Sequence, residues 1–243
     1  MRYRDDRGFM VITLLALLPL VISLILLVTW TYLLLKADGE ARHACRVDLL
    51  SAQKQIGQDL KSLLALNPEA SRLRAELAAI NKVLIATPHP AAHAALEVAR
   101  QKIIAQQLIL AAKQRALIVK AKSLSLTAPS KAMVTVQSAL AKNRRSSGKP
   151  NLGAYKAGTF DVTASPKRSL TPDYNPSARF RDEQIMRLTW KMDVFAILPT
   201  WLKDLMHRSN LFPNGDFHLR AECAATLEKE GTAWSPRLTK DRS

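Results

Sequence analysis

The feature that most constrains this chain is an uncharged, apolar run near its N-terminus, from Phe9 to Leu35. About 20 helical residues cross a bilayer core of about 30 Å, so this run is long enough to span a membrane with some tilt. A secretory signal has a shorter apolar core, of about 7–15 residues, and a small-residue cleavage site. The stretch YLLLKADGEARHAC that ends the run offers neither that site nor a lipoprotein site before Cys45. The sequence therefore predicts a short cytoplasmic leader over 1–8 and a retained transmembrane helix over 9–35.

The charges that flank the run do not decide its orientation by themselves. The two flanks carry equal numbers of basic residues, namely Arg2, Arg4 and Arg7 before the run and Lys36, Arg42 and Arg46 after it. A long C-terminal domain crosses a membrane largely regardless of such flanks, and a short N-terminal stub gives little to translocate. We expect a single-pass protein of the inner (cytoplasmic) membrane, with a cytoplasmic N-terminus and an extracytoplasmic body.

The start of the apolar run carries a resemblance to a known family. Gly8 ends the basic leader and Phe9 opens the apolar helix, as in the type IV prepilin signature, and Pro19 follows within the aliphatic stretch. Together with ADGEARHAC after the run, this N-terminal region resembles the TadE/TadG-like proteins of the Tad (Flp) pilus system. The resemblance implies a pseudopilin-like component in assembly or anchoring of a Tad/Flp-type pilus or a related secretion system. It also implies other pilus-assembly or pseudopilin subunits in the membrane as partners.

Thr13 departs from the pattern of that family. Processed members usually carry Glu five residues after the glycine, where this chain has Thr13. In pilin-like assembly that carboxylate is thought to neutralise the free amine of a neighbouring mature N-terminus, because an ion in hydrocarbon is costly unless it is paired. A chain that is not cut after Gly8 has no such amine to neutralise. Thr13 therefore favours an unprocessed, TadG-like anchor over a subunit that polymerises into the filament.

Helical periodicity continues beyond the membrane run and predicts an amphipathic helical stalk over 36–125. Asn67 before Pro68 is typical of an N-cap with proline at the first helical position, and ATPHPAAH separates the second helix from a third over about 91–123. Apolar residues recur at helical steps: Leu49, Ile56, Leu60, Leu63 and Leu64; Leu73, Leu77, Ile80 and Leu84; and Leu96, Ile103, Ile104, Leu108, Ala111 and Ile118. Core packing between these helices, or with partners, is what such stripes require.

The residue composition and the periodicity of the sequence change after Ser125. Turn-forming residues, glycines and clustered charges predict a basic linker over 126–157. Apolar and polar residues then alternate in three segments, 160–164, 186–194 and 217–227, as expected for a half-buried antiparallel sheet within a domain over 158–243. The expected fold class is α+β, with a transmembrane helix, a helical stalk and a small C-terminal sheet in a pilin-like plan.

The formal net charge of +16 is concentrated in one part of the chain. No acidic residue occurs between Glu97 and Asp161, and the basic patch that we single out there consists of Lys142, Arg144, Arg145 and Lys149. Such a block attracts polyanions. Outside the inner membrane these are anionic lipid, envelope polymer or an acidic partner subunit. Nucleic acid is not expected, because no aromatic side chain is interleaved with these charges to stack on bases.

The basic block defines an alternative function of a different class. In that alternative the chain is a signal-anchored envelope protein that binds an anionic polymer or lipid surface through its stalk. The two functions differ in what the transmembrane helix does, since it is a specific interface in the first and a replaceable tether in the second. A merely solvated basic face remains a third interpretation of the same charges.

Motifs for catalysis or metal binding are sparse in this sequence. No nucleotide-binding loop and no GxSxG element occurs. His89 and His93 have the spacing of helical metal ligands, but Pro90 places His89 before the helix, and no HExxH glutamate accompanies them. We expect no enzyme activity, no metal and no cofactor.

The two cysteines are candidates for a disulfide if the body is exported. Cys223 falls on the apolar face of the last predicted strand, and Cys45 follows the membrane run closely. A bridge would close a very long loop, while two separate thiols are the alternative.

The first prediction concerns the mature N-terminus. Because Thr13 stands in place of the glutamate, we expect the protein extracted from membranes to begin at Met1. Intact-mass measurement tests this directly. A species that lacks MRYRDDRG would contradict the unprocessed anchor and would place the protein among processed, pilin-like subunits.

Overall fold

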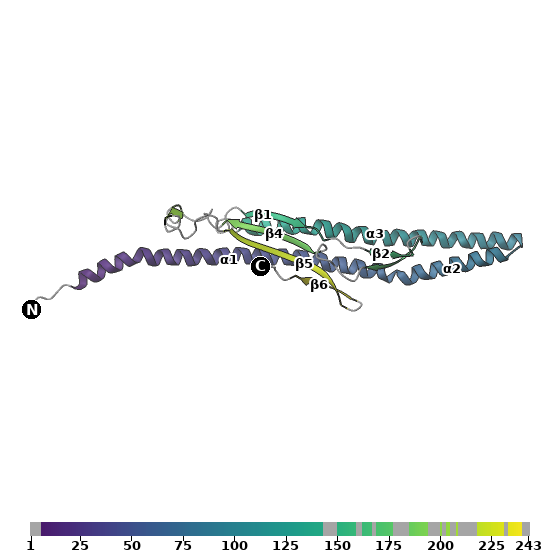
Figure 1. Cartoon of the computed structure of the whole chain (residues 1–243), viewed down its shortest axis with the longest axis horizontal. Helices are drawn as coiled ribbons and strands as arrows, with labels where there is room; N and C mark the ends of the chain where they lie inside the picture. The colour runs from purple at the N-terminus through teal and green to yellow at the C-terminus, as the bar shows by residue number, and fades with distance from the viewer. Residues whose placement is uncertain are drawn as a thin grey trace, which may run out of the picture. The chain divides into compact units, whose positions relative to one another are not determined.

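The structure is a computed structural model that describes residues 6–142, 150–158, 162–166, 169–176, 185–193, 200, 203–204, 208, 218–230 and 233–239. In this part the chain forms helices followed by strands, which confirms the α+β fold class (Figure 1). The helices are α1 (Asp6–Ala65), α2 (Asn67–Ala86) and α3 (Pro90–Lys142). The strands are β1 (Pro150–Lys156), β2 (Val162–Ser165), β3 (Asp173–Pro176), β4 (Met186–Asp193), β5 (His218–Glu230) and β6 (Ala233–Leu238).

The chain divides into two compact units. The first unit consists of Met1–Ala44, Thr135–Leu152 and Trp190–Ala221, and the second of Cys45–Val134, Gly153–Thr189 and Glu222–Ser243. Both units contain part of α1, because the boundary between them falls inside this helix.

Helix α1 is one uninterrupted element from the leader to Ala65. The predicted transmembrane helix and the first stalk helix are therefore the same helix. Its buried residues recur every three or four positions, as Leu34, Ala37 and Ala41 in the first unit and as Cys45, Leu49, Ile56, Leu60 and Leu63 in the second. This spacing places them on one helix face. Arg42 also pairs with Asp38 one turn earlier. Both residues lie in the stretch ADGEAR, which follows the predicted transmembrane segment.

Helices α2 and α3 pack against each other within the second unit. Their shared core contains Ala70 and Leu73 of α2 with Ile103 and Leu110 of α3. Leu66, Leu77 and Ile80 lie against this cluster. The amide of Gln107 on α3 also donates to the Leu73 carbonyl at 3.2 Å. Of the predicted apolar positions on α3, Ile103 and Ala111 are buried, whereas Leu108 is exposed.

Asn67 does not cap α2 in the way that the sequence predicts. The N-cap position is Leu66, without a side-chain hydrogen bond, and Pro68 occupies the first turn. The side chain of Asn67 instead bonds the backbone of Tyr174. Its Nδ2 donates to the Tyr174 carbonyl at 2.9 Å, and its Oδ1 accepts from the Tyr174 N–H at 3.0 Å. A tertiary contact has taken the place of the local cap.

Helix α3 runs to Lys142, so the segment 126–157 is not a linker where the structure describes it. The helix passes through Pro129, and β1 occupies residues 150–156. The physical reason is a stripe of small and apolar residues that continues past the turn-forming APSK. Its buried members are Ala121, Ser125, Ala128, Ala132, Val136 and Leu140. Packing of this stripe outweighs the local preference of those residues for a turn.

The strands form two sheets rather than the single sheet that the alternation predicts. One sheet has the strand order β1-β4-β5-β6, and β2 pairs separately with β3. The β2–β3 pair is antiparallel, from Val162 opposite Pro176 to Ser165 opposite Asp173. Strands β5 and β6 are also antiparallel, with Ala225 opposite Leu238. The predicted end positions Phe160, Val194 and Phe217 lie outside the described residues.

The alternating faces predicted for β4 and β5 are confirmed. The buried residues in phase with the alternation are Met186, Leu188, Trp190 and Met192 on β4 and Ala221, Cys223, Ala225 and Leu227 on β5, and Ala224 is buried out of phase. Strand β1 approaches β4 closely at Gly153. A Cβ atom at Gly153 would lie 2.6 Å from Thr189 Oγ1 and 2.9 Å from the Thr189 carbonyl oxygen, so any larger residue would push the strands apart.

The second prediction tests which face of α3 is internal. Leu110 is 2% exposed and Leu108 is 54% exposed, although only one residue separates them. We expect Leu110→Ala to lower the free energy of unfolding by about 2–5 kcal/mol, because it leaves a cavity. The matched change Leu108→Ala should cost no more than about 0.5 kcal/mol. Denaturant unfolding of the two variants measures the difference, and equal losses would contradict the orientation of α3.

Candidate functional site: the apolar helix, the disulfide and the basic helix face

The N-terminal part of α1 is long and apolar enough to cross a membrane, by length and composition. Only 6% of its most apolar window is buried, whereas the core helix of a soluble protein is mostly covered. Large apolar side chains from Leu14 to Leu33 are exposed around the whole helix. Its surface is therefore apolar on every side.

The hydroxyl groups of Ser23, Thr29 and Thr31 in this apolar segment donate within the helix. Ser23 donates to the Pro19 carbonyl at 2.7 Å, and Thr29 donates to the Ile25 carbonyl at 2.8 Å. Thr31 donates to the carbonyls of the preceding turn. Hydrocarbon supplies no water to bond such groups, so a helix in lipid must satisfy them internally or with a neighbouring helix. These hydroxyls consequently demand no partner, and the helix can lie against lipid or against another helix.

The prepilin-like junction lies inside α1. The helix begins at Asp6, so the Gly8–Phe9 bond and Thr13 are within its backbone, while their side chains lie outside the described part. Pro19 is also inside the helix. It has no N–H, so the carbonyl one turn earlier loses its usual donor.

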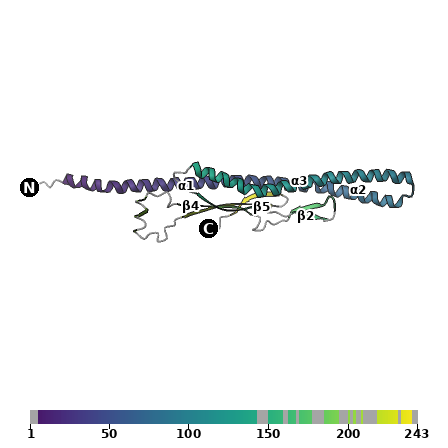
Figure 2. The same cartoon turned by 90° about the horizontal axis from the view of Figure 1, so that it is seen from above.

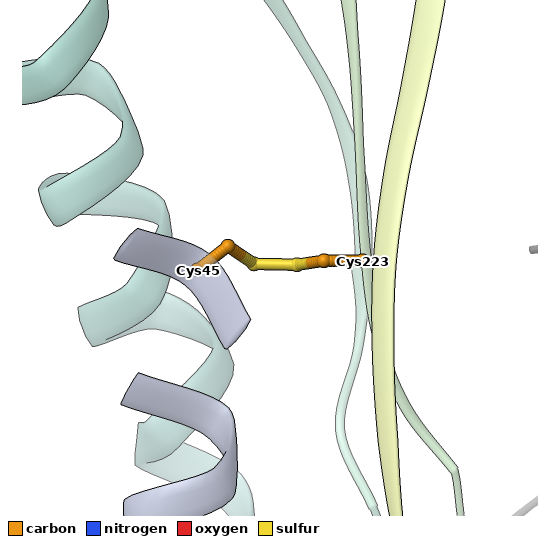
Figure 3. Close-up of a disulfide and its surroundings, with 2 residues drawn as sticks. All are labelled: Cys45 and Cys223. Atoms are coloured by element: carbon orange, nitrogen blue, oxygen red, sulfur yellow. A yellow bond between two sulfur atoms is a disulfide. The ribbon is translucent and has the colours of Figure 1, made fainter. Parts of the chain in front are cut away.

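The two cysteines form a disulfide between α1 and β5, both within the second unit (Figure 3). Cys45 and Cys223 are both buried, their Cα atoms are 6.4 Å apart, and 178 positions separate them in the sequence. Two turns further along α1, Gln53 Nε2 donates to the Ala225 carbonyl of the same strand at 3.5 Å. The strand is therefore attached to the helix at two points.

Gln53 was not singled out from the sequence, although a signal for it exists. It stands between Leu49 and Ile56 on the buried stripe, where helical periodicity leads one to expect an apolar residue. A polar residue at a core position needs a hydrogen-bond partner, because burying it unpaired costs free energy. The same signal marks Gln107 and Gln114 on α3, which are also buried.

Polar side chains from α2 and α3 hold the segment that leads into β3. Arg74 donates to the Thr171 carbonyl and pairs with Asp173. Gln114 Nε2 donates to the Pro172 carbonyl at 3.2 Å. All of these residues belong to the second unit. The small β2–β3 sheet is thus fixed to the helices by hydrogen bonds to its backbone.

The basic residues of α3 divide into those that are paired within the protein and those that are not. Lys120 Nζ lies 2.9 Å from Oδ1 of Asp59, whose side chain is largely buried on α1. Arg100 pairs with Glu97 of the previous turn at 2.8 Å. Within the described residues, no ion pair involves the exposed side chains Lys102, Lys113, Arg115 and Lys122.

The basic patch predicted from the sequence is only partly within the described residues. Lys142 is exposed at the end of α3. Arg144, Arg145 and Lys149 lie outside the described part, so the patch stays a prediction. His89 and His93 are exposed near the start of α3, where the His93 N–H donates to the His89 carbonyl at 3.0 Å. In the described part of the chain, no group of three or more His, Cys, Asp or Glu could hold a metal ion.

The chain matches no protein-family model, no curated protein and no solved structure. The resemblance to TadE/TadG-like proteins therefore rests on the N-terminal residues alone.

The third prediction concerns the disulfide. A bridge that closes so long a loop should contribute about 2–5 kcal/mol to the free energy of unfolding. Reductant should lower the unfolding midpoint of the native protein, whereas the double variant Cys45→Ala/Cys223→Ala should be less stable and insensitive to reductant. Non-reducing peptide mapping should recover the two cysteine peptides linked. Recovery of both as free thiols from oxidised membranes would contradict the bridge and weaken the case for an exported body.

Proposed function

We propose that this chain is a membrane-anchored, pseudopilin-like component that acts in assembly or anchoring of a Tad/Flp-type pilus or a related secretion system. The observation that carries the proposal is the division of α1. One uninterrupted helix is apolar and exposed over its N-terminal part, and it is buried along one stripe from Leu34 onward. A long helix shared between a membrane and a body with an antiparallel sheet is the pilin-like plan that the N-terminal resemblance implies.

The side of α1 on which buried and small residues recur supports a specific role for its membrane segment. The buried stripe Leu34, Ala37 and Ala41 can be followed back toward the N-terminus in steps of three or four residues. It passes through Trp30, Leu27, Ser23, Leu20 or Pro19, and Ala16. Ala16, Pro19 and Ser23 therefore fall, by spacing, on the same helix face as the buried stripe. Small side chains permit close approach of a neighbouring membrane helix, whose packing is not driven by hydrophobic burial.

The mode of action in this proposal is helix contact within the membrane and subunit contact outside it. The Ser23 hydroxyl already donates to the Pro19 carbonyl. A partner helix is therefore recognised by shape rather than by a hydrogen bond from Ser23. The body is tied to the same helix by the Cys45–Cys223 bridge and by Gln53. We propose a single pass through the inner membrane with the N-terminus in the cytoplasm. We propose a structural role, without catalysis.

The alternative function rests on the basic block from α3 onward, which includes the basic patch Lys142, Arg144, Arg145 and Lys149. Lys102, Lys113, Arg115 and Lys122 are exposed, and no acidic residue occurs between Glu97 and Asp161 to offset them. Their summed field attracts an anionic envelope polymer or lipid surface. In that case the membrane helix is only a tether, and binding depends on salt concentration.

The fourth prediction separates the two functions. Replacing residues 9–35 by an unrelated spanning helix should leave the protein folded, abundant and in the membrane. It should nevertheless abolish assembly of the fibre or secretion complex, because the shaped face through Ala16, Pro19 and Ser23 is lost. Neutralising the basic patch with Lys142→Gln, Arg144→Gln, Arg145→Gln and Lys149→Gln should leave assembly largely intact, because exposed charges contribute little to packing. Fibre counts, or co-purification with the assembly subunits from native membranes, measure both effects.

The polymer-binding alternative expects the opposite pair of results. In that case the protein with the replaced helix still functions. Neutralising the basic patch removes salt-sensitive binding to the anionic polymer or lipid surface. A milder variant, Pro19→Leu/Ser23→Leu, keeps the length and apolar character of the span and changes only the shared face. Full assembly by the helix-swapped protein would defeat the pilus-assembly proposal.

A further inference from the structure

Helix α3 has a second apolar stripe on the side opposite its core. We call this the outer stripe, and it consists of Val98, Ala105, Ile109, Ala112, Ala116, Val119 and Leu126, all of which are exposed. Val98 is 72% exposed and Val119 is 66% exposed. The core side of the same stretch carries the buried residues Ile103, Gln107, Leu110, Gln114 and Ala121. Exposed apolar residues that occur singly are normal, but a continuous row on one helix face marks an interaction site.

The spacing of the outer stripe is that of a helix-packing seam. Five members follow one another at intervals of seven residues: Val98, Ala105, Ala112, Val119 and Leu126. Ile109 and Ala116 fall four residues after Ala105 and Ala112, which gives the alternating step of four and three. A repeat of 3.5 residues keeps such positions facing one neighbouring helix over several turns, as in coiled coils. The drift of a straight helix, about 20° per heptad, is small enough to leave them on one side.

The edges of the outer stripe are positively charged. Lys113 lies one turn from stripe residues along one edge, Arg115 and Lys122 do so along the other, and Lys102 takes the seam position four residues after Val98. All four side chains are exposed. Lys120, in contrast, is already paired with Asp59 of α1. The seam and its flanks therefore present an apolar row between two basic edges, with no acidic residue from Val98 to Leu126.

We propose that the outer stripe is the docking face for an amphipathic helix of another protein, whose apolar seam is flanked by Asp and Glu. Charge complementarity identifies this occupant. A second copy that paired through the same stripe would bring like charges together along both edges, and charge patterning of this kind directs helix pairing toward a partner of opposite charge.

A membrane surface fits the outer stripe less well than a helix does. Helices that lie on membranes carry Trp, Phe or Leu on a broad apolar face. The outer stripe has no aromatic residue, and three of its seven members are alanine. Alanine at Ala105, Ala112 and Ala116 leaves room for the backbone of a partner helix, as small residues do at close helix contacts. This proposal does not rest on the pilus role, because it concerns α3 and not the membrane segment of α1.

The fifth prediction tests the docking face with two synthetic peptides. Each peptide is a labelled helix of about four heptads with apolar residues at the seam positions, and the flanking positions carry Glu in one peptide and Lys in the other. The full-length protein in nanodiscs of neutral lipid should bind the Glu peptide at least about tenfold more tightly than the Lys peptide at about 0.15 M salt. Fluorescence anisotropy gives both dissociation constants.

Matched variants separate docking from misfolding and from general charge effects. Val119→Glu should weaken binding of the Glu peptide by about tenfold or more, because it places a like charge in the seam. Val83→Glu is the control, since Val83 is 48% exposed on α2 and lies outside the stripe. Lys113→Gln/Arg115→Gln should weaken binding and flatten its salt dependence, whereas Lys61→Gln/Lys82→Gln, at exposed positions of α1 and α2, should not. Equal binding of the two peptides, or equal effects of Val119→Glu and Val83→Glu, would overturn the proposal.

The other occupants give their own results in the same variants. If sedimentation shows a dimer that Val119→Glu dissociates and Val83→Glu does not, the occupant is a second copy. If vesicles containing anionic phosphatidylglycerol bind through Val119 and the Glu peptide does not compete, the occupant is a lipid surface. Either result overturns docking of an acidic helix.

Discussion

The constraint on which the rest of the structure depends is that α1 is one uninterrupted helix, so a single helical periodicity relates its apolar N-terminal part to its buried stripe. Its N-terminal part is apolar on all sides, and the remainder is buried along a single stripe that begins at Leu34. A helix without a break cannot rotate one part independently of the other. Within the first unit, the buried residues Leu34, Ala37 and Ala41 therefore indicate which side of the apolar segment carries Pro19 and Ser23. In the proposed function, recognition by the apolar segment is oriented by these buried residues.

Alanine supplies many of the buried side chains in the described residues, and this raises the importance of specific cross-links. Ala37 and Ala41 on α1 and Ala121, Ala128 and Ala132 on α3 are all buried. Each buries less apolar area than leucine would, so each contributes less hydrophobic free energy. Within the second unit, three contacts attach strands to helices and do not depend on buried apolar area. They are the Cys45–Cys223 bridge, the Gln53–Ala225 hydrogen bond and the Arg74–Asp173 pair. The sheets depend on these contacts for their position on the helices.

The features that could be predicted from the sequence are those carried by local periodicity. The three helices, and the buried faces of β4 and β5, follow from spacings within each segment. The features that could not be predicted depend on distant partners. APSK and Pro129 favour a turn locally, yet the stripe from Ala121 to Leu140 keeps α3 helical. Val162 and Ala164 alternate correctly, but alternation does not say that β2 pairs with β3 rather than with the main sheet. Asn67 resembles a cap, and only the fold brings Tyr174 to its side chain. Of the candidate site, the cysteine pair and the apolar helix were visible in the sequence. The polar interruptions at Gln53 and Gln114 mark buried amides without identifying their partners, and the contacts of Arg74 follow from no spacing.

The positive charges of α3 have a physical role beside its outer stripe. An exposed apolar row on a long helix is an aggregation hazard, because identical copies can pair through it. Lys113 on one edge, Arg115 and Lys122 on the other, and Lys102 within the row make that pairing repulsive. The same charges leave the row open to a helix of opposite sign. The absence of acidic residues from Val98 to Leu126 is thus not a neutral feature of composition, since even one Glu beside Val119 would weaken the exclusion of like copies and the attraction of an acidic partner at once.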